Sequence, residues 1–217
     1  MFRREVAAYE LSRLLGYDGV PETVIREVEG EIGSVQRKVE KAEVFEYVSF
    51  SERNQVSKGE FVKMYIFDCI IYSSDRHESN VLIKDDRLVA IDNGLSFGDE
   101  FLLFDLRNRK LKRGAEVPLE MKGKLEELLL DDEKMQEIFT MLKKYLKFSD
   151  AIACIKRIEH VAKRLQGNDW KLPRGLFKYL SYNPEKDDDK IGLIEDRTAN
   201  NPDDEYSTSD RELLEAI

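Results

Sequence analysis

Two carboxylates and an amide, Asp75, Asn80 and Asp92, form the pattern in this chain best suited to chemistry. They surround a predicted β-hairpin over residues 81–91, in which apolar runs flank a tight turn at Asp85-Asp86. Asp75 lies in a polar loop that follows an apolar helical stretch. The three oxygen-bearing side chains are therefore predicted to converge at the open end of a rigid hairpin.

The turn position sets the register of this hairpin. The predicted facing pairs are Val81–Ala90, Leu82–Val89, Ile83–Leu88 and Asn80–Ile91. Asn80 and Asp92 then sit side by side. Hard oxygen ligands at such a place suit Mg²⁺, which prefers one or two carboxylates together with phosphate oxygens and water.

Phosphoryl transfer needs this set of groups, because its rate comes from positioning and charge neutralisation. One Asp orients or accepts the proton of the attacking hydroxyl, while an Asn and a second Asp hold metal ions. The spacing of Asp75 and Asn80 is the one that protein kinases use. Two other interpretations remain open: turn-forming and solvated surface groups, or a structural site for a divalent cation without nucleotide.

The neighbouring residues favour the first interpretation. Asp75-Arg76-His77-Glu78-Ser79-Asn80, followed by Ile91-Asp92-Asn93-Gly94-Leu95-Ser96-Phe97, resembles the signatures of the phosphatidylinositol 3- and 4-kinase superfamily. The second motif is especially similar to type II phosphatidylinositol 4-kinases. The resemblance implies ATP and Mg²⁺ as cofactors, Asp75 and His77 as catalytic residues, and Asn80 and Asp92 as metal ligands.

Other segments extend the resemblance over about Glu5 to Phe97. The helix that carries Glu5 is similar to the helix that bridges the lobes of these kinases. Residues 33–36, with Val39 and Glu40, resemble the hinge on which adenine stacks. The resemblance thus implies that Gln36, Val39 and Glu5 contribute to nucleotide binding.

The chain departs from the family pattern at its amino end. The bridging helix begins almost at Met1, no glycine-rich phosphate loop occurs, and Glu5 has no obvious lysine partner. Three explanations stay open: a truncated or mis-started reading frame, a small lobe supplied by a second chain, or a minimal protein that binds nucleotide weakly or not at all. The intact motifs favour an active parent enzyme whose upstream part is missing here.

Apolar periodicity predicts both helices and strands, and hence an α+β fold. The resemblance implies that this fold is protein-kinase-like, with a mainly helical carboxyl-terminal lobe, a catalytic β-hairpin and a truncated amino-terminal lobe. The expected units are a remnant of the amino-terminal lobe and hinge (1–40), a helical catalytic lobe (41–182) and an acidic tail (183–217), expected to be disordered or loosely attached. Residues 40–58 are expected to be polar and irregular. The predicted helices are Arg3–Leu15, Glu60–Tyr72, Leu119–Leu130, Asp132–Leu146 and Ser149–Leu165, and the predicted strands before the catalytic hairpin are Val20–Val28 and Ile32–Gln36.

Charge and composition limit the partners. The formal net charge of the 217 residues is −9, nearly all of it in the tail, where 12 Asp or Glu stand against 4 Lys or Arg. No clustered basic face stands out over a long stretch of the sequence, which argues against a nucleic-acid partner. The acidity of the chain also disfavours unaided binding to anionic lipid. The sequence predicts no transmembrane segment, and its two distant cysteines fit a reducing cytoplasm.

These observations together predict an ATP- and Mg²⁺-dependent phosphotransferase that acts on a hydroxyl group. The acceptor is expected to be a protein or small molecule rather than a membrane lipid. The alternative is a catalytically inactive, truncated pseudokinase that acts as a nucleotide- or protein-binding module. In that case Asp75 would be replaceable without loss of function.

Overall fold

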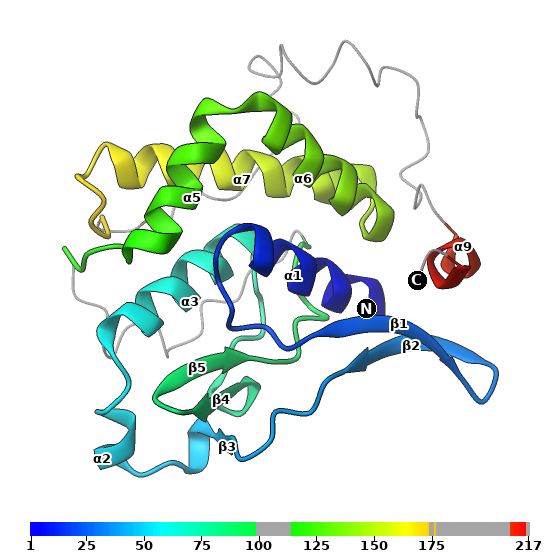
Figure 1. Ribbon diagram of the computed structural model, residues 1–217, viewed down its shortest axis with the longest axis horizontal. Coiled ribbons are helices and arrows are strands. Elements are labelled where there is room, and N and C mark those ends of the chain that lie inside the picture. Colours follow the sequence, from blue (N-terminus) through cyan, green and yellow to red (C-terminus); the bar gives the residue numbers. More distant parts are fainter. Residues whose placement is uncertain (99–113, 174–175, 177–208, 216–217) are drawn as a thin grey trace.

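The computed structural model describes residues 1–98, 114–173, 176 and 209–215. Helices and strands lie largely in separate parts of the molecule (Figure 1). The strands form a two-stranded ribbon of β1 and β2 and a three-stranded sheet in the order β3-β4-β5, both antiparallel. The α+β class is thereby confirmed, and the two-lobed kinase arrangement stays a prediction.

The elements agree closely with the predicted ones. Each of the five predicted helices is found within two residues of its expected bounds. The helical elements are α1 (Phe2–Leu14), η1 (Phe45–Tyr47), α2 (Phe50–Arg53), α3 (Lys58–Ile71), η2 (Glu78–Asn80), α5 (Leu119–Leu130), α6 (Asp132–Tyr145), α7 (Phe148–Gln166) and α9 (Asp210–Glu215). The strands are β1 (Thr23–Val28), β2 (Glu31–Gln36), β3 (Glu43–Val44), β4 (Val81–Lys84) and β5 (Arg87–Ala90).

Helix α3 is the central element and leads into the candidate site. Its first turn is capped by the Ser57 hydroxyl, which accepts a hydrogen bond from the Glu60 N–H at 3.3 Å. Most of its side chains are buried, including Phe67 and Ile70, which have no exposed surface. The helix ends at Tyr72 in the left-handed conformation. A buried helix of this kind provides a rigid base for the loop that follows it.

The remaining helices enclose α3 and the strands. Helix α7 packs on α3, α5 and α6, while α1 packs on α6 and on the β1–β2 ribbon. Figure 1 shows α1 and α3 between the α5–α7 layer and the strands. One main apolar core joins α1, α3, the β4–β5 hairpin and the α5–α7 layer. The candidate catalytic hairpin is therefore anchored to the same core as the helices.

The β4–β5 hairpin has the predicted register. Its pairs are Val81–Ala90, Leu82–Val89, Ile83–Leu88 and Lys84–Arg87. Asp85 and Asp86 both have positive φ, at 49° and 59°, as the two central residues of a type I′ turn require. The Ile91 N–H donates to the Asn80 carbonyl at 3.1 Å, which extends the pairing by one step. Asn80 and Asp92 are thus neighbours across the hairpin's open end.

The expectation of irregular structure over residues 40–58 was wrong in part. β3 adds to the hairpin through pairing of Glu43 with Ile83 and Val44 with Leu82. One-turn helix α2 follows, held by a capping box between Ser49 and Glu52. Elements of two to four residues are too short to show a period, so their sequence gives no apolar pattern.

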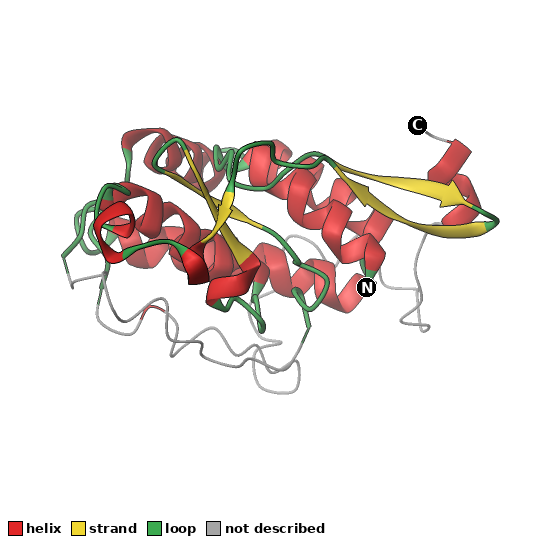
Figure 2. Cartoon of the chain, turned by 90° about the horizontal axis from the view of Figure 1, so that it is seen from below, coloured by secondary structure: helices red, strands yellow, loops and turns green. Residues whose placement is uncertain are grey.

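The β1–β2 ribbon extends away from α3, α5 and α7, and α9 lies beside it (Figure 2). Thr23 and Ile25 are buried near α1, and the strand becomes exposed toward Val28. Glu29 and Gly30 form the turn, both with positive φ. The ribbon packs on α1 and α9.

Helix α9 lies within the segment that was expected to be disordered or loosely attached. Leu213 is buried against Val6 of α1 and Ile25 of β1, and Asp210 forms an ion pair with Arg3. The Ser209 hydroxyl accepts from the Glu212 N–H, and the Glu212 carboxylate accepts from the Ser209 N–H. Residues 183–208 lie outside the described residues.

Candidate functional site

The loop after α3 brings Asp75, His77 and Asn80 together. The His77 N–H donates to the Asp75 carbonyl and the Asn80 N–H donates to the His77 carbonyl, both at 3.0 Å. The Asn80 amide Nδ2 donates to the Asp75 carbonyl at 2.9 Å and lies 3.4 Å from Asp75 Oδ2. Because Nδ2 is engaged with Asp75, the amide oxygen of Asn80 is left as the atom suited to a cation.

The His77 ring faces Asp75 through a defined nitrogen. Its Nδ1 accepts a hydrogen bond from the Ser79 N–H at 3.2 Å, so in the neutral ring the proton is on Nε2. Nε2 lies 3.7 Å from Asp75 Oδ2, and the Asp75 side chain is 42% exposed. The carboxylate is therefore open to solvent on one side and bordered by a ring N–H on the other.

Arg76 is completely buried and fixes the loop. Its Nε donates to Asp68 at 3.1 Å, while Nη1 donates to the carbonyls of Asn80 at 2.9 Å and Ile91 at 2.6 Å. Its Nη2 donates to Oδ1 of Asn93. One guanidinium thus ties α3, the loop and the end of the hairpin into a single unit.

Asp92 follows the hairpin directly. Its φ of 53° is left-handed and its side chain is exposed, whereas Asn93 and Gly94 are buried. Since Ile91 is paired with Asn80 and Asn93 is held by Arg76, the position of Asp92 between them is fixed at both ends. The structure therefore brings Asp92 to the Asp75–His77–Asn80 loop, as the register predicted.

Glu5 reaches this cluster from α1. Its carboxylate lies against Gly94, where an added side-chain carbon would come within 3.2 Å of Oε1. Burial, the largest effect, raises the pKa of Glu5 above its ordinary value, and the nearby charge of Asp92 adds to the rise. Glu5 is therefore a half-buried carboxylate beside the segment that follows Asp92.

The sequence reasoning missed the roles of Asn93 and Gly94. The Asn93 side chain accepts from Arg76, and a side chain at position 94 would crowd Glu5. Their place directly after Asp92 in the motif was the only signal for them. Nothing in their types alone points to a backbone contact with α1.

The two predicted hinge residues lie elsewhere. Gln36 ends β2, opposite Thr23, and its Nε2 donates to the Thr23 hydroxyl at 3.0 Å. Val39 is itself half-buried and lies in the mostly exposed loop that leads to β3. The hydrogen bonding of Gln36 places it with the ribbon and not with the Asp75–Asp92 cluster. Their nucleotide role stays a prediction.

The cluster has the donor chemistry that Mg²⁺ requires. Among the described residues, no three Asp, Glu, His or Cys side chains are arranged as a metal-binding group. Mg²⁺ does not need such a cage, because it commonly takes one or two carboxylates and completes its shell with phosphate oxygens and water. The exposed Asp92 carboxylate and the Asn80 amide oxygen are donors of that kind, and the backbone pairing of Ile91 with Asn80 sets their residues at the same end of the hairpin.

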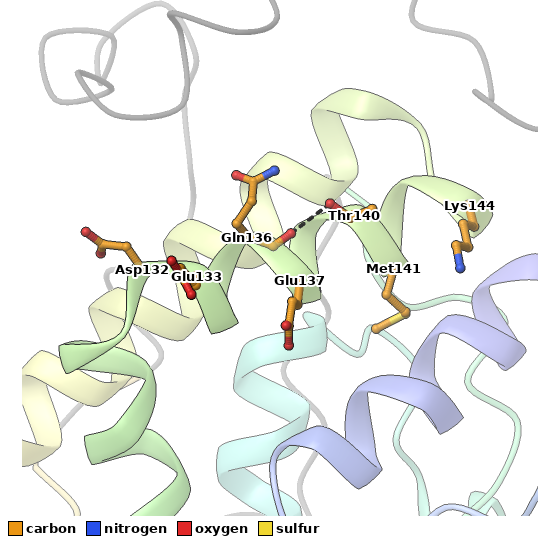
Figure 3. A pocket seen from close by; sticks show the side chains of 7 residues that line it. All are labelled: Asp132, Glu133, Gln136, Glu137, Thr140, Met141 and Lys144. Carbon is orange, nitrogen blue, oxygen red and sulfur yellow. Dashed lines mark hydrogen bonds between the residues drawn. The ribbon is translucent and has the colours of Figure 1, made fainter.

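A separate hollow lies along α6 (Figure 3). Its described lining is Asp132, Glu133, Gln136, Glu137, Thr140, Met141 and Lys144. Acidic and basic groups both line it, and none of the predicted site residues does. This hollow is therefore distinct from the candidate site.

Two aspartates and an asparagine are the residue types that kinases use for phosphoryl transfer. A family model described as phosphatidylinositol 3- and 4-kinase matches residues 32–150, more than half of the chain. The chain belongs to this family, which confirms the resemblance in its motifs and supports its assignment as a kinase. Asp75, His77, Asn80 and Asp92 lie within the matched residues, and Glu5 lies before them.

No curated protein matches the chain. No helix among the described residues is long and apolar enough to cross a membrane. The closer likeness to type II phosphatidylinositol 4-kinases and the truncated amino-terminal lobe both stay predictions.

Proposed function

We propose that this chain is an ATP- and Mg²⁺-dependent phosphotransferase that moves the γ-phosphoryl group to a hydroxyl acceptor. One observation carries the proposal: Asp75, His77 and Asn80 share a loop that the buried Arg76 joins to the hairpin end bearing Asp92. Family membership supports the same reaction class. The proposal includes a division of the chain into three parts. These are a remnant lobe and hinge (1–40), a catalytic lobe (41–182) and a tail (183–217).

Asp75 is proposed to orient the attacking hydroxyl and accept its proton. Its carboxylate is partly exposed, as a group that must meet an acceptor should be. The neighbouring Nε2 of His77 and Nδ2 of Asn80 limit the directions from which a hydroxyl can approach. His77 is placed to hold the carboxylate in that orientation or to share the proton.

Asn80 and Asp92 are proposed to hold Mg²⁺. When bound, the metal would neutralise charge on the phosphate oxygens. The chain's own contribution is to fix the two ligands, since Asn80 is 7% exposed and held by Asp75, and Asp92 follows a paired strand residue. Gln36, Val39 and Glu5 remain the proposed nucleotide contacts.

The acceptor is proposed to be a protein or small-molecule hydroxyl. The net charge of −9 gives the chain no general attraction to anionic lipid. The family description names phosphatidylinositol, so vesicles containing this lipid belong in the acceptor panel.

Calorimetric titration with ATP, with and without Mg²⁺, tests the proposal in the parent, Asp92→Asn and Asp75→Asn. We expect Mg²⁺-dependent binding in the parent, its loss in Asp92→Asn and its retention in Asp75→Asn, with transfer to the panel abolished in the latter. Absence of nucleotide binding in the parent would contradict the proposal and favour a non-catalytic binding module. Unchanged transfer in both variants would show that the residue roles are wrong.

A further inference from the structure

The segment formed by η1 and α2, residues 45–53, packs on η2, the short 3₁₀ turn in the loop after α3. The Ser79 hydroxyl donates a hydrogen bond to the Glu46 carboxylate. Nη1 of Arg53 donates to the Glu78 carboxylate at 3.0 Å. Two consecutive residues of η2 are therefore bound by two side chains of one neighbouring segment.

Arg53 joins η1 to η2. Its Nε donates to the Val48 carbonyl at 2.9 Å and its Nη2 to the Glu46 carbonyl at 2.7 Å, while Nη1 reaches Glu78. The guanidinium carbon lies 4.5 Å from the centroid of the Phe45 ring, and the side chain is 20% exposed. Because each of the three nitrogens has an acceptor in a fixed direction, the guanidinium holds η1 and η2 in one relative position. A lysine, with a single nitrogen, could not make the same three contacts.

The connection continues from Glu46 to the proposed base. Ser79, whose hydroxyl binds Glu46, also donates its backbone N–H to Nδ1 of His77 at 3.2 Å. That hydrogen bond leaves the proton of the neutral ring on Nε2, the atom 3.7 Å from Asp75 Oδ2. A displacement of Ser79 would therefore change both the tautomer and the direction of the His77 ring.

The two arginines hold neighbouring parts of this loop. Arg76 fixes the Asn80 carbonyl, one residue beyond the Ser79 N–H that binds the His77 ring. Arg53, with the segment that it holds together, acts on the two residues before Asn80. The orientation of His77 therefore depends on the second arginine as well as on the first.

We infer that Arg53 and Glu46 are positioning residues, which set the orientation of His77 toward Asp75 through Ser79. The catalytic consequence rests on the function proposed above, while the hydrogen-bonded connection does not. The inference gives a role to residues 45–53, which carry none of the predicted site residues.

The ring nitrogens of His77 test the connection without any nucleotide. The chain has two histidines, so ¹⁵N spectra at about pH 8, where most histidines are neutral, report both tautomers, and His160→Gln assigns the signals. We expect the His77 proton on Nε2 in the parent. Arg53→Met should give a mixture of tautomers and about tenfold faster amide exchange at Ser79, because η2 is released. Arg37→Met, at an exposed ion pair, is the matched control and should change neither signal. A parent-like tautomer and exchange rate in Arg53→Met would overturn the inference.

Substitutions at both ends of the ion pair show whether the contact is direct. Arg53→Met and Glu78→Gln should each accelerate exchange at Ser79, and the double variant should exchange no faster than Arg53→Met alone. Arg53→Lys keeps the charge but loses contacts to η1, so it should restore only part of the protection. Additive effects of the two single variants would contradict a direct contact. Circular dichroism shows whether each variant remains folded.

Transfer kinetics test the catalytic consequence. Glu46→Ala should lower the transfer rate at saturating ATP about tenfold with ATP affinity unchanged, because it affects only the ring that faces the base. In a His77→Asn background the same substitution should add little further loss. An unchanged rate in Glu46→Ala, or a loss of ATP affinity alone, would overturn the positioning role. If the parent transfers no phosphoryl group, the proposed function fails, and the tautomer of His77 still decides the connection.

Discussion

Nε of Arg76 lies 3.1 Å from Oδ1 of Asp68, and neither side chain is more than 1% exposed. Asp68 is in the last turn of α3 and Arg76 in the loop after it, so the pair fastens the loop to the central helix. The same guanidinium reaches the carbonyls of Asn80 and Ile91. The geometry of the proposed site thus depends on a buried ion pair that is itself remote from solvent.

Breaking this pair should be strongly destabilising. Arg76→Met leaves the Asp68 carboxylate buried without its partner, so the free energy of unfolding should fall by about 3–5 kcal/mol in urea denaturation. Arg37→Met is the control, because the Arg37–Glu22 pair is 77% and 48% exposed, and its loss should cost less than about 1 kcal/mol. Similar losses in the two variants would contradict this account of the buried pair.

Removing both partners separates stability from geometry. In Arg76→Met combined with Asp68→Leu no buried charge is left unpaired, so the double variant should be more stable than Arg76→Met alone. The ties to Asn80, Ile91 and Asn93 are still absent, and Mg²⁺-dependent ATP binding should stay impaired. Recovery of both stability and binding would show that Arg76 acts only as a charge partner.

The Tyr17 hydroxyl offers a second stability test. The ring packs on Phe67 with centroids 4.8 Å apart, and the buried hydroxyl has no hydrogen-bond partner among the described residues. Tyr17→Phe keeps the ring and removes a buried polar group, so thermal or urea unfolding should show equal or higher stability, by up to about 1 kcal/mol. Tyr47→Phe, at an 80% exposed position, should leave stability unchanged. Destabilisation by Tyr17→Phe would mean that the hydroxyl has a partner.

Much of the site could be predicted because its signals are local. The hairpin register follows from the turn position, and α3 follows from its apolar surface. The close approach of Glu5 to Gly94 could not be predicted, since a glycine that leaves room for a distant side chain has no local signature and the two residues are far apart in the chain. The same holds for α9, where only the buried Leu213 distinguishes a packed helix from an acidic tail.

Stability should decrease in alkaline solution, because burial raises the pKa of the Cys154 thiol from 9.0 to about 11. The unfolded chain then loses its thiol proton before the native chain does. The stabilisation is complete below pH 9 and is lost as the pH rises through 11. Between pH 8 and pH 10 this group should lower the free energy of unfolding by about 1 kcal/mol.

Urea denaturation at the two pH values measures this effect. Cys154→Ala lacks the thiol. Its free energy of unfolding should therefore decrease less between pH 8 and pH 10 than that of the parent, whatever its value at pH 8. Tyr17→Phe serves as a second variant, because burial also raises the pKa of the Tyr17 phenol. Ionisation of this phenol in the unfolded chain should lower the free energy of unfolding further above pH 10. An identical decrease in the parent and Cys154→Ala would assign the alkaline sensitivity to other groups.

Docking of α9 depends mainly on one apolar side chain. Leu213 is 4% exposed against Val6 and Ile25, so Leu213→Ala should lower the free energy of unfolding by about 2 kcal/mol and speed amide exchange in β1. Asp210→Asn removes only the charge that pairs with Arg3, at a position 45% exposed, and should cost less than about 1 kcal/mol. If the charge change were the costlier of the two, the ion pair would be the main determinant of docking.

The two nitrogens of His77 can be tested one at a time. His77→Asn offers an oxygen close to the position of Nδ1, which accepts from the Ser79 N–H, and removes the group that faces Asp75. His77→Gln reaches further and offers an amide N–H near the position of Nε2. If Nε2 positions Asp75 for proton transfer, His77→Asn should lower the transfer rate by about 10²-fold or more with ATP affinity unchanged, and His77→Gln should lose less. The reverse order would assign the role of His77 to shaping the loop through Ser79, and amide exchange at Ser79 in both variants would distinguish the two cases directly.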